Sequence, residues 1–394
     1  MSDFLRRTWA QINLDNIVHN FETLKALLDG DSQIMAVIKA DAYGHGDSYV
    51  AHALRQKGVK WFGVANIEEA ISLRNAGIEE DILVFSFTPC TLAQTLCRYD
   101  ITQAVYSLDY AKQLNSYAEK ENVKVKCHLK LDTGMGRLGF LGYESKINLY
   151  PITKTLSLPA LNFGGVFTHF SSADENTEDS RQFTREQFLL FLNICNALED
   201  RGFYLGLKHC CNSAATISFP EMHMDLVRPG IALYGHAPSE ELRGKVFLKP
   251  AMELFSTIAM IKTVEEGYTV SYNRTYKAEP YTKIASIPMG YADGYPRILS
   301  NRSSMIVNGE FAPVAGRICM DNMMLNITDI NANEGDVVTV FGNTDGKSMS
   351  VETIAKMAGT IPYELICAVG KRVSRVYMQN GAQIAVTKYK DVVY

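Results

Sequence analysis

The chain has 394 residues and a formal net charge of −4, with 47% hydrophobic and 21% charged residues, the make-up of a globular protein with room for about two or three domains. A slightly acidic chain without a basic run gives no sign of a nucleic-acid surface, and no apolar stretch is long enough for a membrane span or a signal peptide. The eight cysteines lack CxxC spacing, so we expect reduced thiols and a cytoplasmic protein.

Apolar runs in the first 240 residues predict eight strands. They are Ile34–Ile38, Trp61–Ala65, Ile82–Phe85, Ile101–Tyr106, Val123–Leu131, Asn162–Thr168, Leu205–Cys210 and Met224–Tyr234. Helix-like segments lie between most of them, the clearest at Asp179–Asp200. This alternation predicts a parallel sheet, and eight units in about 240 residues favour a closed (βα)8 barrel over an open sheet.

The pattern changes at a linker around 236–250, after which the helical period largely disappears. Strands are expected near Asn322–Thr328 and Asp336–Phe341, a turn at Asp345-Gly346 and one helix at Val351–Ala358. We therefore predict an N-terminal strand (1–14) associated with a mostly β domain (246–394), and a barrel spanning 15–240.

Lys39 ends the first predicted strand and precedes Tyr43, Gly44 and Gly46. A lysine leaving a desolvated strand favours the neutral amine, which is the form that condenses with an aldehyde. The two glycines would allow close backbone approach and Tyr43 offers a hydroxyl, which suits a phosphate-bearing ligand. A lysine reaching solvent from a sheet edge is the ordinary alternative.

Other polar side chains follow the predicted strands at the end where barrel active sites lie. They are Lys130, Arg137, His169, His209, Ser213 and Arg228. Each alone could be a satisfied core residue, but their joint position favours one site. The glycine-rich loop around Arg137 suits a carboxylate, and the backbone amides after Arg228 can bind a phosphate.

Seven segments resemble, in order, the motifs of alanine racemases, which hold pyridoxal phosphate on a lysine. They are Lys39–Gly46, Leu131–Gly139, His209–Ser213, Arg228–Ile231, Gly290–Gly294, Gly316–Asp321 and Ile361–Glu364. The resemblance covers nearly the whole chain, and chance matching of all seven is not credible. It implies a racemase that interconverts L- and D-alanine, supplying D-alanine for peptidoglycan.

The resemblance also implies a role for each residue. Lys39 carries the cofactor, and Arg228 faces its ring nitrogen, with His209 supporting Arg228 and His169 linking it to Tyr291. The phosphate is held by Tyr43, Ser213, Tyr363 and the amides of Gly230 and Ile231. Arg137 and the backbone of Met320 take the substrate carboxylate, and Lys130, which can carry a carbamate, braces Arg137. No metal is expected.

Racemisation requires two groups on opposite faces of a planar intermediate. The resemblance assigns one face to Lys39 and the other to Tyr291, and implies a head-to-tail homodimer. There, Lys39 of one subunit would meet Tyr291, Cys319, Met320 and Asp321 of the other. Because those residues lie in separate predicted domains, the sequence is compatible with such shared sites.

Three alternatives stay open. A pyridoxal-phosphate carrier built from the barrel alone would not need Tyr291 or the segment at Cys319. A decarboxylase of basic amino acids with the same barrel usually has an acid where Arg228 stands. A serine-preferring or broad-specificity racemase is the third; Tyr363, which matches the family residue that limits side-chain room, favours alanine.

Overall fold

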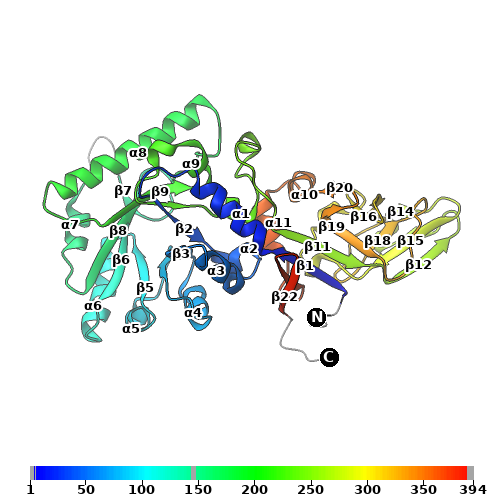
Figure 1. Ribbon diagram of the computed structural model, residues 1–394, viewed down its shortest axis with the longest axis horizontal. Coiled ribbons are helices and arrows are strands. Elements are labelled where there is room, and N and C mark those ends of the chain that lie inside the picture. The colour runs from blue at the N-terminus through cyan, green and yellow to red at the C-terminus, as the bar shows by residue number, and fades with distance from the viewer. Residues whose placement is uncertain (1–3, 5, 143–147, 388–394) are drawn as a thin grey trace. The chain divides into compact units, whose positions relative to one another are not determined.

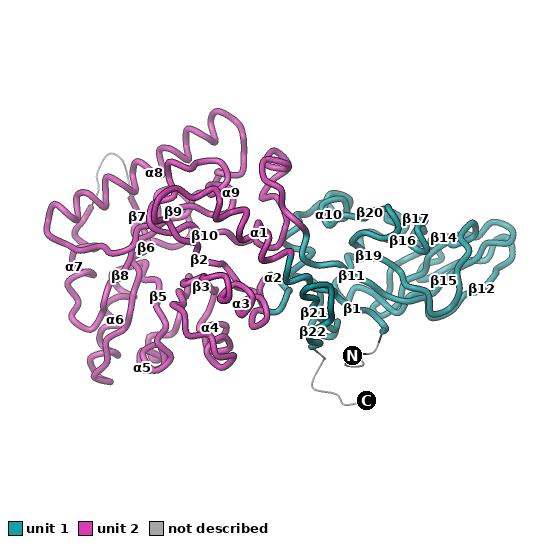
Figure 2. Tube along the Cα trace, viewed as in Figure 1, with its two compact units in different colours: residues 1–15, 43–46, 250–394 teal, residues 16–42, 47–249 magenta. Residues whose placement is uncertain are grey.

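The computed structural model describes residues 4, 6–142 and 148–387. Contacts divide the chain into two compact units, coloured separately in Figure 2. Unit 1 comprises Met1–Asp15, Tyr43–Gly46 and Pro250–Tyr394, and unit 2 comprises Asn16–Ala42 and Asp47–Lys249. The predicted domains divide the chain differently, because they place residues 43–46 in the barrel. Their bounds stay a prediction.

Unit 2 is built on a closed parallel barrel, as the sequence predicts. Its eight strands run in the order β5-β4-β3-β2-β10-β9-β8-β6, and β5 pairs with β6 to close the ring. They are β2 (Gln33–Val37), β3 (Trp61–Val64), β4 (Asp81–Val84), β5 (Ile101–Val105), β6 (Val125–Asp132), β8 (Leu161–Phe167), β9 (Leu207–Asn212) and β10 (Leu226–Arg228). A two-residue strand, β7 (Phe140–Leu141), adds to β6.

Helices lie around the outside of this barrel (Figure 1). They include α1 (Leu14–Lys25), α3 (Asp47–Arg55), α4 (Ile67–Asn75), α5 (Ala93–Arg98), α6 (Leu108–Lys120), α7 (Tyr150–Leu156), α8 (Glu178–Glu199) and α9 (Ser213–Ser218). The long helix predicted at 179–200 is α8, which Thr177 caps by accepting from the Ser180 amide. Phe183 of this helix is exposed, because Thr184 and Gln187 take the buried positions of that turn.

The last barrel strand is much shorter than predicted. Only three residues of the run at 224–234 form β10, which ends at Arg228. Pro229 has no backbone N–H to extend the ladder, and Ile231–Tyr234 form a 3-10 helix, η3. The strand therefore stops where the sequence changes from Arg228 to Pro229, which leaves the arginine as its final residue.

Unit 1 is mostly β, as predicted. One sheet has the order β17-β16-β19-β11-β1-β21-β22, with β20 paired to β19; a second has the order β12-β15-β18, and β13 pairs with β14. The strands are β1 (Thr8–Asn13), β11 (Met252–Thr257), β12 (Met260–Val264), β13 (Thr269–Val270), β14 (Tyr276–Lys277), β15 (Thr282–Ile287), β16 (Ser304–Val307), β17 (Glu310–Pro313), β18 (Met323–Asn326), β19 (Val337–Thr344), β20 (Lys347–Met349), β21 (Ser374–Gln379) and β22 (Ala382–Thr387).

Two local predictions in unit 1 can be compared with the structure. The helix expected at 351–358 is α10 (Val351–Ala358), but a second helix, α11 (Pro362–Ala368), was not predicted. Its seven residues are too few for a clear helical period, although Pro362 stands at its first position, where proline is favoured. Asp345 and Gly346 form the tight turn between β19 and β20, both with positive φ. In the described ranges no helix is long and apolar enough to cross a membrane.

Candidate active site

Lys39 follows β2 directly and opens a turn of left-handed backbone, α2 (Lys39–Tyr43). Residues 40–42 have φ between 52° and 55°, a conformation that costs a residue with a side chain about 1–2 kcal/mol. The Glu69 carboxylate holds this turn, accepting from the amides of Ala40 at 2.8 Å and Ala65 at 2.7 Å. Strain of this kind persists only where surrounding contacts enforce it, and it is commonest at functional sites.

Arg228 is 4% exposed, and all its hydrogen-bond partners in the described structure are uncharged acceptors. One terminal nitrogen donates to His209 Nδ1 at 2.8 Å. The other donates to the carbonyls of Thr168 at 2.7 Å and Cys210 at 3.0 Å, and lies 3.3 Å from His169 Nδ1. Burial lowers the pKa of Arg228 to about 10, which still leaves it charged at neutral pH. The barrel thus holds a buried cation without a bonded carboxylate.

Both histidines beside Arg228 are neutral. Burial, with Arg228 as the next cause, holds the pKa of His169 and of His209 well below the usual value. A guanidinium can only donate, so the Nδ1 atom of each imidazole must accept from it. The predicted association of His169 and His209 with Arg228 therefore matches the geometry of this part of the barrel.

Phe167, at the end of β8, lies against three of these polar groups. Its ring is stacked on His209, with centroids 4.9 Å apart and planes at 4°. Lys130 Nζ lies 5.3 Å from its centroid and Arg228 Cζ lies 5.4 Å away, both within the range of cation–π attraction. Sequence analysis did not single out this residue, and only its position two residues before His169 indicates that it faces the site.

Lys130 is buried among cations. Burial, followed by the charges of Arg137 and Arg228, lowers the pKa of Lys130 to about 8, while Asp132 acts in the opposite direction and Lys39 adds to the lowering. The same Lys39 charge contributes to the lowered pKa of His169. The four predicted cationic residues of unit 2 are therefore close enough to influence one another, as a single site requires.

Asp132 organises the glycine-rich loop that carries Arg137. Its Oδ1 accepts from the backbone amides of Gly134, Met135 and Gly136 at 2.9–3.1 Å, and its Oδ2 accepts from the amide of Arg137 at 3.0 Å. Four amides therefore converge on one buried carboxylate, and the Arg137 side chain is left exposed to bind an anion. Sequence analysis missed Asp132, although an aspartate before a run of glycines is typical of such turns.

Ser213 contacts the segment that follows Arg228. Its Oγ accepts from the amides of Gly230 at 2.8 Å and Ala232 at 3.4 Å. The hydroxyl can still donate its own hydrogen. The structure thus brings together Ser213, Gly230 and Ile231, which the sequence assigned to one phosphate site.

The other two predicted phosphate residues belong to unit 1. The rings of Tyr43 and Tyr363 have centroids 6.1 Å apart, and burial, then Tyr363, raises the pKa of Tyr43. The two glycines of this segment have a role in packing that the sequence did not predict. A Cβ on Gly44 would lie 2.4 Å from the carbonyl oxygen of Ile366, and one on Gly46 would lie 1.9 Å from the hydroxyl of Tyr377. These glycines are needed for packing against the protein's own residues, and the approach of a ligand to them stays a prediction.

Tyr291 and Met320 lie on two segments of unit 1 that are joined through their backbones. The amide of Tyr291 donates to the Cys319 carbonyl at 3.0 Å, and the next amide donates to the Met320 carbonyl, also at 3.0 Å. Tyr291 is 41% exposed and Met320 is 53% exposed. Asp321 forms an ion pair of 2.7 Å with Arg372. The predicted residues Tyr291, Cys319, Met320 and Asp321 thus form one surface.

Tyr272 is a further tyrosine beside this surface, and sequence analysis missed it. Its side chain is exposed, and it is flanked by positive φ angles at Ser271, Asn273 and Arg274. The Ser271 hydroxyl lies 3.5 Å from the Sγ of Cys319. Backbone strain around an exposed tyrosine is a structural signal that residue types and periodicity do not reveal.

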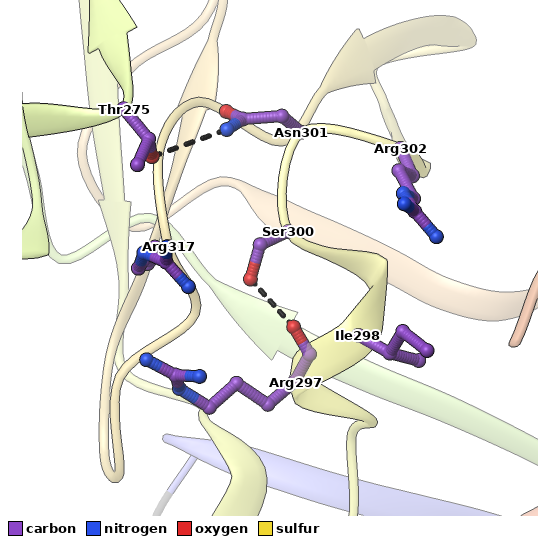
Figure 3. Close-up of a pocket in the computed structure, with 7 residues that line it drawn as sticks. All are labelled: Thr275, Arg297, Ile298, Ser300, Asn301, Arg302 and Arg317. Atoms are coloured by element: carbon purple, nitrogen blue, oxygen red, sulfur yellow. Dashed lines mark hydrogen bonds between the residues drawn. The ribbon is translucent and has the colours of Figure 1, made fainter. Parts of the chain in front are cut away.

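A cavity of about 450 Å3 lies within unit 1 and is rich in arginine (Figure 3). Asn301 donates to the hydroxyl of Thr275 and Ser300 donates to the carbonyl of Arg297 in its wall. Its lining favours anions, and it includes none of the predicted site residues. The lining residues are Thr275, Arg297, Ile298, Ser300, Asn301, Arg302 and Arg317.

Known families match the chain along nearly its whole length. The model of the alanine racemase N-terminal domain matches residues 12–238, and that of the alanine racemase C-terminal domain matches residues 251–377. The chain belongs to the alanine racemase family. An alanine racemase from Clostridium tetani is 44% identical over 99% of this chain and all of the relative, and one from Clostridium perfringens is 42% identical over 98% of this chain and 99% of the relative.

Solved alanine racemases have the same fold. One from Clostridium difficile 630 is 38% identical with a TM-score of 0.92, covering 98% of this chain and all of that one. The Bacillus anthracis alanine racemase with bound L-Ala-P is 34% identical with a TM-score of 0.93, covering 98% and 99% of the two chains. The enzyme is an isomerase of the amino-acid racemase class, and the predicted family and activity are confirmed.

Proposed function

We propose that this alanine racemase works with pyridoxal 5′-phosphate attached to Lys39 at the mouth of the barrel. The observation that carries the proposal is Arg228, a buried cation whose hydrogen-bond partners among the described residues are all neutral. When bound, the cofactor supplies an electron-withdrawing ring that stabilises negative charge on the substrate α-carbon. The residues present fit it: Lys39 provides the amine, and the groups around Ser213 and Gly230 suit a phosphate.

Arg228 sets how strongly that ring withdraws electrons. A guanidinium keeps its proton, so Arg228 donates a hydrogen bond to the ring nitrogen without transferring a proton. His209 and His169 hold the guanidinium in place. Tyr43, Ser213, Tyr363 and the amides of Gly230 and Ile231 would hold the phosphate, the Gly230 amide in place of its bond to Ser213. By keeping its proton, Arg228 would make the ring a weaker electron sink, which would limit side reactions such as transamination.

The α-proton is exchanged between two bases on opposite faces of the substrate. Lys39 serves one face, and a tyrosine of unit 1 serves the other. The sequence assigns this role to Tyr291. Tyr272 is the second candidate and the one we favour, because its exposed ring is flanked by strained backbone and its neighbour Ser271 contacts Cys319.

Arg137 and the backbone of Met320 bind the substrate carboxylate. Lys130 braces Arg137 after its amine has reacted with carbon dioxide to give a carbamate, which turns a cation into an anion. The lowered pKa of Lys130, about 8, supports this modification, since only the neutral amine reacts with carbon dioxide. Tyr363 limits room for the substrate side chain and favours alanine over serine.

Two protomers complete each site in this proposal. Lys39 of one protomer meets the tyrosine base, Cys319, Met320 and Asp321 of its partner in a cytoplasmic homodimer that supplies D-alanine for peptidoglycan. Refolding Lys39→Ala chains together with chains carrying both Tyr272→Phe and Tyr291→Phe would leave one intact site per mixed dimer. Roughly a quarter of wild-type activity should then return. Verified mixed dimers without activity would contradict shared sites.

Racemisation of L-alanine and L-serine, measured side by side, tests the proposed specificity. We expect alanine to be the better substrate by kcat/KM, and Lys39→Ala to abolish both reactions. Equal rates on the two amino acids would favour the broad-specificity alternative, and an unaffected Lys39→Ala variant would reject the assigned site.

A further inference from the structure

A buried histidine of the barrel, His128 on β6, has no part in the chemistry proposed above. It is 1% exposed, and its Nδ1 lies 2.9 Å from Nε2 of His209. The opposite ring nitrogen of His209 lies 2.8 Å from Arg228. A buried polar group is costly unless it is hydrogen-bonded. The three side chains satisfy one another as a continuous row that ends at the last residue of β10.

Only one arrangement of hydrogens satisfies this row. Arg228 can only donate, so His209 Nδ1 accepts. Burial and the neighbouring Arg228 and His128 keep His209 neutral by lowering its pKa, and its single hydrogen is therefore on Nε2. Burial and Arg228 likewise lower the pKa of His128 to about 3. His128 is then neutral as well, and its Nδ1 accepts from His209.

Packing fixes both imidazole rings. A Cβ on Gly165 would lie 2.5 Å from the His128 ring, so only glycine fits beside it. The Trp61 ring packs against His128 at a tilt of 46°, with centroids 5.2 Å apart, and His209 is stacked on Phe167. Neither ring can turn over without displacing a neighbour. Because both rings stay in place, the acceptor on His128 can determine which nitrogen of His209 carries the hydrogen.

We propose that His128 is a positioning residue for racemisation: by accepting from His209 Nε2, it keeps His209 in the tautomer that receives Arg228. This inference rests on the proposed contact between Arg228 and the cofactor ring nitrogen. With the hydrogen on Nδ1 instead, His209 would present a donor to the donors of Arg228, and the guanidinium would move. His128 acts only through His209 and Arg228.

Two substitutions at one position separate this role from simple filling of the core. His128→Asn keeps an acceptor close to the place of Nδ1, whereas His128→Leu has similar bulk and no acceptor. His223→Leu is the control, because His223 is also buried in unit 2 and bonded, through its Nε2, to the carbonyl of Thr216. Each variant is studied as the cofactor-loaded enzyme.

Two measurements read the tautomer and the cofactor directly. In protein labelled with 15N-histidine, NMR should show His209 protonated on Nε2 in the wild type and in His128→Asn, but a mixture of tautomers in His128→Leu. The absorbance spectrum of the bound cofactor should change in His128→Leu alone. We expect kcat to fall about tenfold or more in that variant, as for other supporting residues, with KM little changed and recovery in His128→Asn.

Unchanged tautomer, spectrum and kcat in His128→Leu would overturn the proposal. So would an equal spectral change in His223→Leu, since any lost buried histidine would then have the same effect. Failure of the proposed function would give a different result from failure of this inference about His128. Cofactor attached to a lysine other than Lys39 would reject that function even if the His209 tautomer behaved as expected.

Discussion

Arg228 in unit 2 and Arg372 in unit 1 show opposite ways of placing an arginine. Arg372 donates to both carboxylate oxygens of Asp293 at 2.8 and 3.0 Å and pairs with Asp321, whereas Arg228 bonds only to neutral acceptors. Asp293 has no exposed side-chain surface and is also bound by Arg7. A compensated charge network stabilises a fold, while an uncompensated buried cation lowers stability and favours binding of an electron-rich partner.

This contrast indicates that Arg372 and Asp293 serve the fold, whereas Arg228 is placed for the proposed reaction. Burial raises the pKa of Asp293, but hydrogen bonds from Arg7, Arg372 and the Gly290 amide more than offset this, so its pKa is lowered. The resulting stabilisation is present above the pKa of an unfolded aspartate, about 3.9, and is lost as the pH falls through the lower folded value. At neutral pH the network therefore contributes fully.

The largest expected effect concerns the part of unit 1 that we assign to chemistry. Tyr272→Phe should slow exchange of the α-proton of L-alanine by about 10³-fold, because a positioned acid–base group contributes on that order. Exchange from D-alanine, which we assign to Lys39, should change much less, and deuterium exchange measured by NMR separates the two.

Tyr291→Phe and Tyr204→Phe are the comparisons for this prediction. Tyr204 is exposed on unit 2 just before β9, at the opposite end of the barrel from the proposed site. A large loss in Tyr291→Phe with a normal Tyr272→Phe would return the role to the residue that the sequence assigned. Equal loss from both enantiomers would reject the two-base assignment.

Replacing Arg228 by glutamate removes the buried cation of the barrel and puts a carboxylate in its place. The barrel site should then lose the property that distinguishes it from the charge network of unit 1. In the proposed site, the acid of Arg228→Glu would face the ring nitrogen and allow it to hold a proton, so racemisation should slow by about 100-fold while transamination increases. Product analysis by chromatography measures both, and circular dichroism checks folding. A slower enzyme with no added transamination would show that Arg228 acts only by holding its neighbours in place.

Removing the Asp293 carboxylate from unit 1 should instead lower the free energy of unfolding. Asp293→Asn leaves Arg7 and Arg372 without their shared anion, and because both arginines are partly exposed we expect a loss of about 2–3 kcal/mol, near the low end for breaking a buried pair. The two tryptophans report separately, since Trp9 lies in β1 of unit 1 and Trp61 in β3 of unit 2.

Single-tryptophan backgrounds, Trp61→Phe and Trp9→Phe, make this readout specific. In urea unfolding followed by fluorescence, the Trp9 transition should shift to lower urea in Asp293→Asn. If the Trp61 transition moved as far as the Trp9 transition, or if the Trp9 transition did not move, the network would not be a local stabiliser of unit 1.

The smallest effect is expected at Lys130. With a pKa of about 8, a minor fraction of its amine is neutral at neutral pH, and carbamate formation should increase as the pH rises towards that value. A 13C signal from labelled bicarbonate should appear in the wild type and be absent from Lys130→Ala, whose kcat/KM should fall about tenfold. Lys126→Ala is the control on the same strand, because Lys126 is exposed and paired with Asp100.

The barrel could be predicted because each strand is a short apolar run, and the separate β unit because the helical period stops. Lys39, Arg137, His209 and Arg228 could be named because polar residues at strand ends contradict a core pattern, and because the motifs resemble a family. Asp132, Phe167 and Tyr272 could not, since their importance depends on loop amides, a shared ring face and backbone strain. The packing of Gly44 against Ile366 could not be predicted either, because a glycine does not reveal which atom approaches it.

Attachment of the cofactor to Lys39 is the central claim, and reduction with borohydride tests it most directly. Reduction makes the link between pyridoxal phosphate and its lysine permanent, and peptide mapping by mass spectrometry then identifies the residue. The account predicts the label on Lys39, with none on the neighbouring Lys130. A label on any other lysine, or no label on protein that racemises alanine, would contradict it.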